Sequence, residues 1–138
     1  MTNNKKGFTL IELVVVMAII AVLAALMVGA ISAARQQATN TQRVGNVKTV
    51  ETALETRASK CGGNYFASAT NCTAIADTTS FTTLETALQT NGFLSSLLSI
   101  DNDAKYVVTT GIAAGNNTYT IKAMDNSATP VALYTATR

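Results

Sequence analysis

A run of 22 residues without a charged side chain, residues 13–34, constrains this chain more than any other feature. As a helix rising ~1.5 Å per residue, the run reaches roughly 33 Å, enough to cross a bilayer core of about 30 Å. We therefore expect residues 8–34 to span a membrane. Of the 138 residues, roughly 100 are left, which allows one small domain and no second one.

The charges on either side of the run predict its orientation. Lys5 and Lys6 precede it, which places the N-terminus in the cytoplasm and the residues after the run, beginning with Arg35 and Arg43, outside. The eight Lys and Arg residues that remain without Lys5 and Lys6 balance the eight Asp and Glu residues. Binding of nucleic acid through bulk positive charge is therefore not supported.

Glu12 lies at the edge of the apolar run, at or just inside the lipid boundary. An ionisable group is costly there and usually marks a function, so we expect Glu12 to have a partner. The alternative is an uncleaved signal anchor in which Glu12 simply reaches back to the lipid headgroups.

The helical pattern continues beyond the membrane run, and no strong helix breaker occurs before Gly62 and Gly63. We expect one helix from Thr9 to Ser59, with Gly29 and Gly45 as weak points. Its outer half has an apolar stripe formed by Val44, Val47, Val50, Leu54 and Ala58. The charged residues expected on its other faces are Arg43, Lys48, Glu55 and Arg57.

The two cysteines, Cys61 and Cys72, both lie in the part of the chain assigned to the outside. An even number of cysteines in an oxidising compartment favours one disulfide, worth on the order of 3 kcal/mol for a loop of this length. A reactive or metal-binding pair is the alternative, but the chain has no histidine to complete a zinc site.

A short helix is expected after the disulfide loop. Thr82 and Glu85 have the spacing of a capping box at its start, and Asn91 with Gly92 provides the stop. An apolar cluster follows, which we expect to lie under the domain core. It comprises Phe93, Leu94, Leu97, Leu98 and Ile100.

The last third of the sequence predicts an antiparallel sheet of three to four strands. Three segments, 106–111, 118–124 and 131–137, are rich in β-branched and aromatic residues, and turns at 114–117 and 125–127 separate them. In the middle strand Tyr119, Ile121 and Ala123 alternate with polar residues, so one face should be wet. The amphipathic half of the long helix is the element that can cover the other face, which gives an α+β fold.

The segment Lys-Gly-Phe-Thr-Leu-Ile-Glu, residues 6–12, followed by an apolar helix of membrane length, closely resembles the N-terminus of type IV pilins and pseudopilins. The resemblance implies a pilin-like fold, a leader at residues 1–7 that a prepilin peptidase removes after Gly7, and methylation of the new Phe8 amine. It also implies that residues 8–34 form the core of a helical homopolymer and that residues 35–138 form a globular domain. An assembly platform in the cytoplasmic membrane is the further partner it implies.

Cleavage and assembly have a common physical reason. Cutting after Gly7 creates a cationic amine at Phe8, and a Glu12 carboxylate that faces the amine of a neighbouring copy largely escapes the penalty of burial. Many relatives have a proline where this chain has Gly29. Because glycine keeps its N–H, melting of the helix at Gly29 is permitted here rather than imposed.

Other sites carry weaker signals. Lys105, Lys122 and Arg138 could form a basic patch, although a solvated sheet face is the preferred interpretation. We find no catalytic motif, no metal site and no need for a cofactor. The expected function is a structural subunit of an extracellular type IV pilus, made first as a single-pass membrane precursor. The alternatives are a pseudopilin of a secretion or DNA-uptake apparatus and, from another class, a membrane-anchored binding domain.

Overall fold

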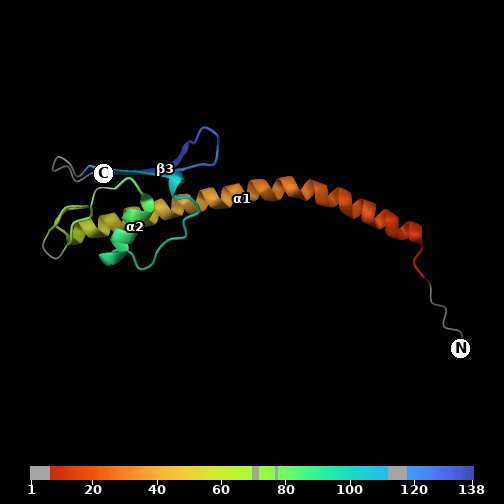
Figure 1. The fold of residues 1–138 in the computed structure, drawn as a ribbon, viewed down its shortest axis with the longest axis horizontal. Helices are drawn as coiled ribbons and strands as arrows, with labels where there is room; N and C mark the ends of the chain where they lie inside the picture. Colours follow the sequence, from red (N-terminus) through yellow and green to blue (C-terminus); the bar gives the residue numbers. More distant parts are fainter. Residues whose placement is uncertain (1–6, 70–71, 77, 112–117) are drawn as a thin grey trace, which may run out of the picture. The chain divides into compact units, whose positions relative to one another are not determined.

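The computed structural model describes residues 7–69, 72–76, 78–111 and 118–138 (Figure 1). Residues 1–6 of the expected leader and the turn expected at 114–117 lie outside the described residues. The chain divides into two compact units, Met1–Gln37 and Ala38–Arg138, which are treated separately below.

Helix α1 extends over 51 residues, Leu10–Lys60, within one residue at each end of the predicted span. It is unbroken at Gly29 and at Gly45, since both lie inside the continuous helix. In the first unit its large apolar side chains are exposed from Leu10 to Ile31. No residue from 7 to 37 buries them.

In the second unit α1 buries the predicted apolar stripe. Val47, Val50 and Leu54 are completely buried, Ala58 is nearly so, and Val44 packs against the core from its margin. Repeats of three and four residues place these side chains on one side of the helix. The stripe was therefore predicted correctly from its periodicity.

A three-stranded antiparallel sheet covers that stripe, in the order β1-β2-β3. Its strands are β1 (Tyr106–Thr110), β2 (Tyr119–Met124) and β3 (Ala132–Thr137), each one residue shorter than predicted. Residues 119, 121 and 123 of β2 are buried and those between them are not, as the alternation predicted. The second unit thus has the predicted α+β, pilin-like architecture, with the outer part of α1 packed on a small sheet.

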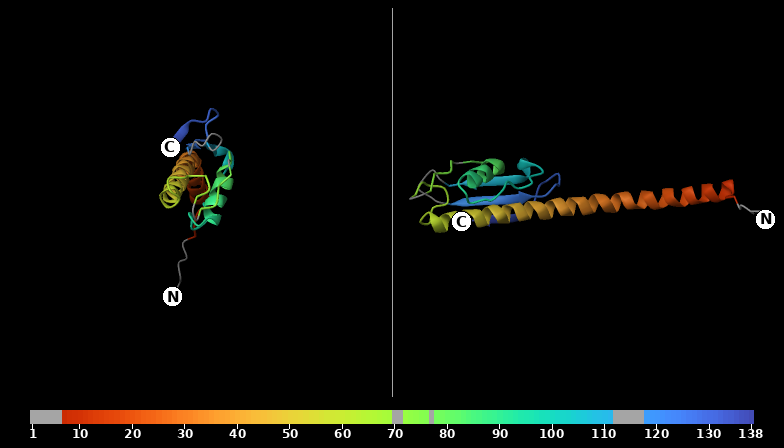
Figure 2. Two further views of the ribbon diagram at one scale, coloured as in Figure 1. Left: turned by 90° about the vertical axis from the view of Figure 1, so that its left-hand side faces the viewer. Right: turned by 90° about the horizontal axis from the view of Figure 1, so that it is seen from below.

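Helix α2, Phe81–Thr90, closes the other side of the core (Figure 2). Its N-cap is Ser80, whose Oγ accepts a hydrogen bond of 3.3 Å from the Thr83 amide. The predicted capping box of Thr82 and Glu85 is therefore wrong. The helix is capped two residues earlier than Thr82.

Both residues of that expected capping box have partners elsewhere. The Thr82 amide and hydroxyl each donate to Asp103 Oδ1 at 2.8 Å. Glu85 is almost completely buried and accepts a hydrogen bond from the Leu98 amide. These tertiary contacts, which sequence spacing does not reveal, outweigh the local preference for a cap.

The segment after α2 partly fulfils its prediction. Leu94 is buried, and three further members of the cluster, Phe93, Leu98 and Ile100, pack against the core. The prediction is wrong for Leu97, because 55% of its surface is exposed.

The disulfide between Cys61 and Cys72 is present, with the two Cα atoms 5.9 Å apart. It closes a loop that folds back on the end of α1. Phe66 within the loop and Ile75 just after it both belong to the hydrophobic core.

Arg57 holds this loop in place, although we predicted it on an outer face of α1. Its side chain is completely buried. Its guanidinium donates to the carbonyl oxygens of Asn64 (2.9 Å), Ala67 (3.2 Å) and Thr73 (2.6 Å). Burial lowers the pKa of Arg57 below its ordinary value. The helical pattern failed here because the residues that receive Arg57 come later in the chain.

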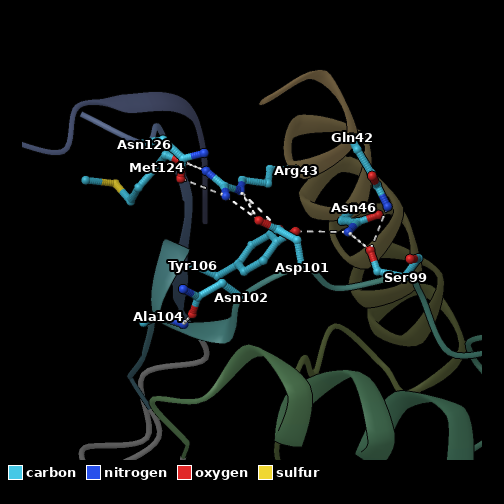
Figure 3. Close-up of polar contacts among 10 residues, drawn as sticks. All are labelled: Gln42, Arg43, Asn46, Ser99, Asp101, Asn102, Ala104, Tyr106, Met124 and Asn126. Carbon is cyan, nitrogen blue, oxygen red and sulfur yellow. Dashed lines mark hydrogen bonds and ion pairs between the residues drawn. The ribbon is translucent and has the colours of Figure 1, made fainter. Parts of the chain in front are cut away.

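Arg43, also predicted on an outer face, is buried and joins three segments (Figure 3). It forms an ion pair with Asp101, and its Nη1 donates to the Met124 carbonyl oxygen at 3.0 Å. Its Nη2 donates to Asn126 Oδ1, also at 3.0 Å. Hydrogen bonds to the Arg43 guanidinium lower the pKa of Asp101, and the same pairing raises the pKa of Arg43.

Two acidic residues of α1 fasten strand β3 and the residue that follows it. Glu51 accepts a hydrogen bond of 2.7 Å from the Tyr134 hydroxyl. Glu55 accepts from the hydroxyls of Tyr65 and Tyr119 at 3.2 Å and from Arg138 Nε at 3.1 Å. Arg138, one of the three residues of the basic patch considered above, is thus paired with a carboxylate.

The Arg43–Asp101 pair predicts how stability depends on pH. Because the pKa of folded Asp101 lies below its unfolded value of about 3.9, the pair stabilises the domain above that value and is lost as the pH falls through the folded pKa. We expect Asp101→Asn to lose about 1.5–3 kcal/mol at pH 7 and to show a flatter acid limb, measured by denaturant unfolding of the detergent-solubilised chain.

Arg43→Met provides the matched control for this prediction. In that background Asp101 has lost its cation, so adding Asp101→Asn should cost little more. Identical acid limbs for the wild type and Asp101→Asn would contradict the prediction.

Candidate functional site

The start of α1 carries the candidate site. Gly7 and Phe8 precede the helix and are exposed, Phe8 to 87%. A Cβ atom built on Gly7 would meet no heavy atom within 4 Å. The peptide bond between Gly7 and Phe8 is thus an open, non-helical segment of the kind that a protease can bind. Cleavage at this bond stays a prediction.

Thr9 and Glu12 form a capping box at this helix start. The Thr9 amide and the Thr9 hydroxyl each donate to Glu12 Oε2 at 2.8 Å. In return the Glu12 amide donates to Thr9 Oγ1 at 3.4 Å. This reciprocal pattern satisfies two amides that the first helical turn would otherwise leave without partners.

Thr9 is the functional residue that our sequence analysis missed. Its signal was present, because Thr-x-x-Glu before an apolar run is the sequence pattern of a capping box. The capping box changes the interpretation of Glu12. In the single chain its carboxylate has hydrogen-bond donors, but Thr9 provides no positive charge to neutralise it.

Phe8 and Glu12 lie on the same side of the chain. Together with Ile11, Val15 and Val16 they line one shallow hollow of about 320 Å³. Apart from Glu12 these residues are apolar. The hollow is thus an apolar surface with a single carboxylate at its edge.

The apolar part of α1 is long and apolar enough to cross a membrane, and the qualifying segment is not buried at all. An exposed apolar surface of this size marks a contact with lipid or protein. Together with the motif around Gly7, it supports a membrane-anchored precursor.

The other predicted site residues lie apart from the candidate site in sequence. A Cβ atom built on Gly29 would also meet nothing within 4 Å, so no packing contact requires glycine there. Melting of the helix at Gly29 in an assembly stays a prediction. Cys61 and Cys72 are joined in the second unit. Over the described ranges, no group of three or more His, Cys, Asp or Glu residues is placed to hold a metal ion.

Comparison with known families gives one finding. Residues 2–33 match the family model described as the prokaryotic N-terminal methylation motif. The match includes Gly7, Phe8, Thr9 and Glu12. No match to the chain is found among curated proteins or among solved structures.

The capping box predicts a specific effect of the Thr9 hydroxyl. Thr9→Val keeps the branched shape but removes the hydroxyl, and loss of an N-cap costs about 1 kcal/mol. We expect amide hydrogens in the first turn of α1 to exchange about fivefold faster in the lipid-reconstituted precursor, measured by NMR. Thr9→Ser, which retains a hydroxyl, should exchange like the wild type. Equal protection in the Val and Ser variants would show that the hydroxyl does not cap the helix.

Proposed function

We propose that this chain, which carries the leader motif of type IV pilin and pseudopilin precursors, is a structural subunit of an extracellular type IV pilus, as its major pilin. The observation that carries the proposal is an exposed apolar helix of membrane length. Its first turn holds a carboxylate, Glu12, which forms a capping box with Thr9. Such a helix needs a membrane before assembly and other helices after it.

Maturation begins at the leader. A prepilin peptidase removes residues 1–7, and the new amine of Phe8 is N-methylated, which preserves its charge. The uncut precursor cannot assemble, because its Phe8 nitrogen is a neutral amide and because Lys5 and Lys6 would enter the helix core. Removal of the leader thus converts a stored membrane subunit into one that can assemble.

Glu12 directs the register of assembly. An unpaired carboxylate among packed apolar helices costs several kcal/mol, and hydrogen bonds from Thr9 compensate only its need for donors. The Phe8 amine of a neighbouring copy provides the missing positive charge. A neighbour placed one turn too high or too low would leave both ions unpaired, so this pair selects one position.

This role divides the chain into two parts with different functions. Residues 8–34 hold the subunit in the cytoplasmic membrane, with the N-terminus in the cytoplasm, and then form the filament core. Residues 35–138 form the outer surface of the filament. An assembly platform in the membrane extends the filament with energy from a separate ATPase, so this chain acts as a structural subunit and not as an enzyme.

The same motif also favours a second function, that of a pseudopilin in a secretion or DNA-uptake apparatus. Abundance separates the two, because a major pilin dominates surface filaments and a pseudopilin does not. A membrane-anchored binding domain is the third alternative, and it would keep an intact Met1.

Mass spectrometry of filaments sheared from the cell surface tests the proposal. We expect this chain to be the most abundant component and to begin at a methylated Phe8. A chain that is abundant in membranes, starts at Met1 and is absent from sheared material would contradict the proposal.

If Glu12 acts in assembly alone, replacing it should impair assembly and leave cleavage of the leader intact. Glu12→Ala should still lose its leader, because the cut depends on residues around Gly7, but should yield at least about tenfold fewer filaments. Immunoblots of whole cells and sheared fractions measure the two steps. Glu12→Asp, which keeps the charge on a shorter side chain, serves as the control and should retain more assembly than Glu12→Ala. A normal filament yield from Glu12→Ala would remove the register role.

A further inference from the structure

Two limbs of the chain are hydrogen-bonded to each other beyond the end of α1. We refer to residues 61–69 as the outgoing limb and to residues 72–76 as the returning limb. The Cys72 amide donates to the Ala69 carbonyl oxygen at 2.9 Å, in an isolated bridge and not in a pair of strands. The Ile75 amide donates across the limbs to the Phe66 carbonyl oxygen, also at 2.9 Å. Regular secondary structure alone therefore holds the limbs together weakly.

Arg57 lies between the two limbs and binds both. On the outgoing limb its guanidinium donates to the carbonyl oxygens of Asn64 at 2.9 Å and Ala67 at 3.2 Å. On the returning limb Nη2 donates to the Thr73 carbonyl oxygen at 2.6 Å. A guanidinium can do this because its N–H groups point outward in a fixed plane. One buried side chain thus joins segments that few backbone hydrogen bonds connect.

The burial of this cation depends on the position of both limbs. The guanidinium of Arg57 stays ionised, so its N–H groups need acceptors where water is excluded. Over the described ranges these acceptors are backbone carbonyl oxygens, and Arg57 Nε has none. If the returning limb moved away, Nη2 would also lose Thr73, its nearest acceptor. Hydration of Arg57 would then be favoured over its burial.

The disulfide joins the same two limbs, since Cys61 begins one of them and Cys72 begins the other. A covalent link limits how far the limbs can separate when the structure opens. Without the link, hydrogen bonds have to keep Thr73 beside Arg57 in competition with water. Loss of the disulfide should therefore favour an open state in which Arg57 is hydrated.

The outgoing limb has an anchor of its own, so opening should be confined to the returning limb. The rings of Tyr65 and Phe66 pack edge-on against Tyr119 of β2, with ring centroids 5.1 Å and 6.4 Å from its own. On the returning limb, burial of Ile75 opposes opening. Opening is thus a local equilibrium, and the disulfide shifts it toward the closed state.

We propose that the disulfide between Cys61 and Cys72 is the condition for burying Arg57, so that this end of the globular unit closes only after oxidation. The two thiols lose two protons and two electrons by exchange with a disulfide of an oxidising partner, which becomes a dithiol. In a reducing compartment the returning limb stays open and Arg57 stays hydrated. This redox-sensitive closure belongs to the globular unit and goes beyond the proposed filament function.

Chemical labelling of arginine tests the proposal without any substitution. Phenylglyoxal reacts with accessible guanidinium groups, and mass spectrometry of the detergent-solubilised full chain locates the labelled residues. After reduction by a phosphine, Arg57 should react at least about tenfold faster than in the oxidised chain. Arg138, whose side chain is 62% exposed, should react at the same rate in both states. Unchanged protection of Arg57 after complete reduction would overturn the proposal.

A substitution tests whether Arg57 is the reason for the sensitivity to reduction. In the wild type, reduction should speed hydrogen exchange of the Ile75 amide at least about tenfold. In Arg57→Met the effect should fall below about threefold, because an apolar side chain in this position needs no acceptors. Lys48→Met, at an exposed position of α1, is the matched control and should respond like the wild type.

Two outcomes of the exchange experiment would overturn the proposal. The first is an Arg57→Met variant as sensitive to reduction as the wild type. The second is an equal loss of protection at Ile121 in β2, because the disulfide would then support the whole unit and not the burial of Arg57. If Arg57→Met does not fold even when oxidised, the labelling experiment on the unmodified chain decides.

Discussion

The carboxylate of Glu12 at the head of an exposed apolar helix is the constraint on which the rest of this molecule depends. Its capping box with Thr9 allows the helix to begin where it does and to remain in lipid without an unsatisfied acceptor. The same capping box leaves the negative charge uncompensated. Under the proposed function, the precursor is stable in the membrane because these hydrogen bonds are satisfied, and it gains free energy on assembly because the charge still lacks a cation.

Most of the architecture could be predicted from the sequence, because it depends on local periodicity. The length of α1, its buried stripe at Val47, Val50 and Leu54, and the three strands all follow from repeats of three to four or of two residues. The disulfide between Cys61 and Cys72 followed from an even number of cysteines in a segment predicted to lie outside the membrane.

The errors at Arg43 and Arg57 have one physical origin, which is that both charged side chains were assigned to outer faces of the helix. Arg43 and Arg57 are buried because residues far along the chain provide acceptors for them, Asp101 in one case and backbone carbonyls in the other. Glu85 is drawn inward by the Leu98 amide in the same way. Helical spacing shows which face a residue occupies, but it does not show what later segments place against that face.

Specificity in an assembly of such chains has to come from few groups. Helices built from Val, Leu, Ile and Ala gain similar packing energy in many positions, so the apolar core alone selects no register. Under the proposed function, the single charge at Glu12 fixes the position of each subunit along the axis. The rotation about that axis remains free until the globular units meet. Arg43 shows how a residue buried for the stability of one subunit also shapes its surface, since it binds the β2–β3 turn at the Met124 carbonyl oxygen and at Asn126 Oδ1.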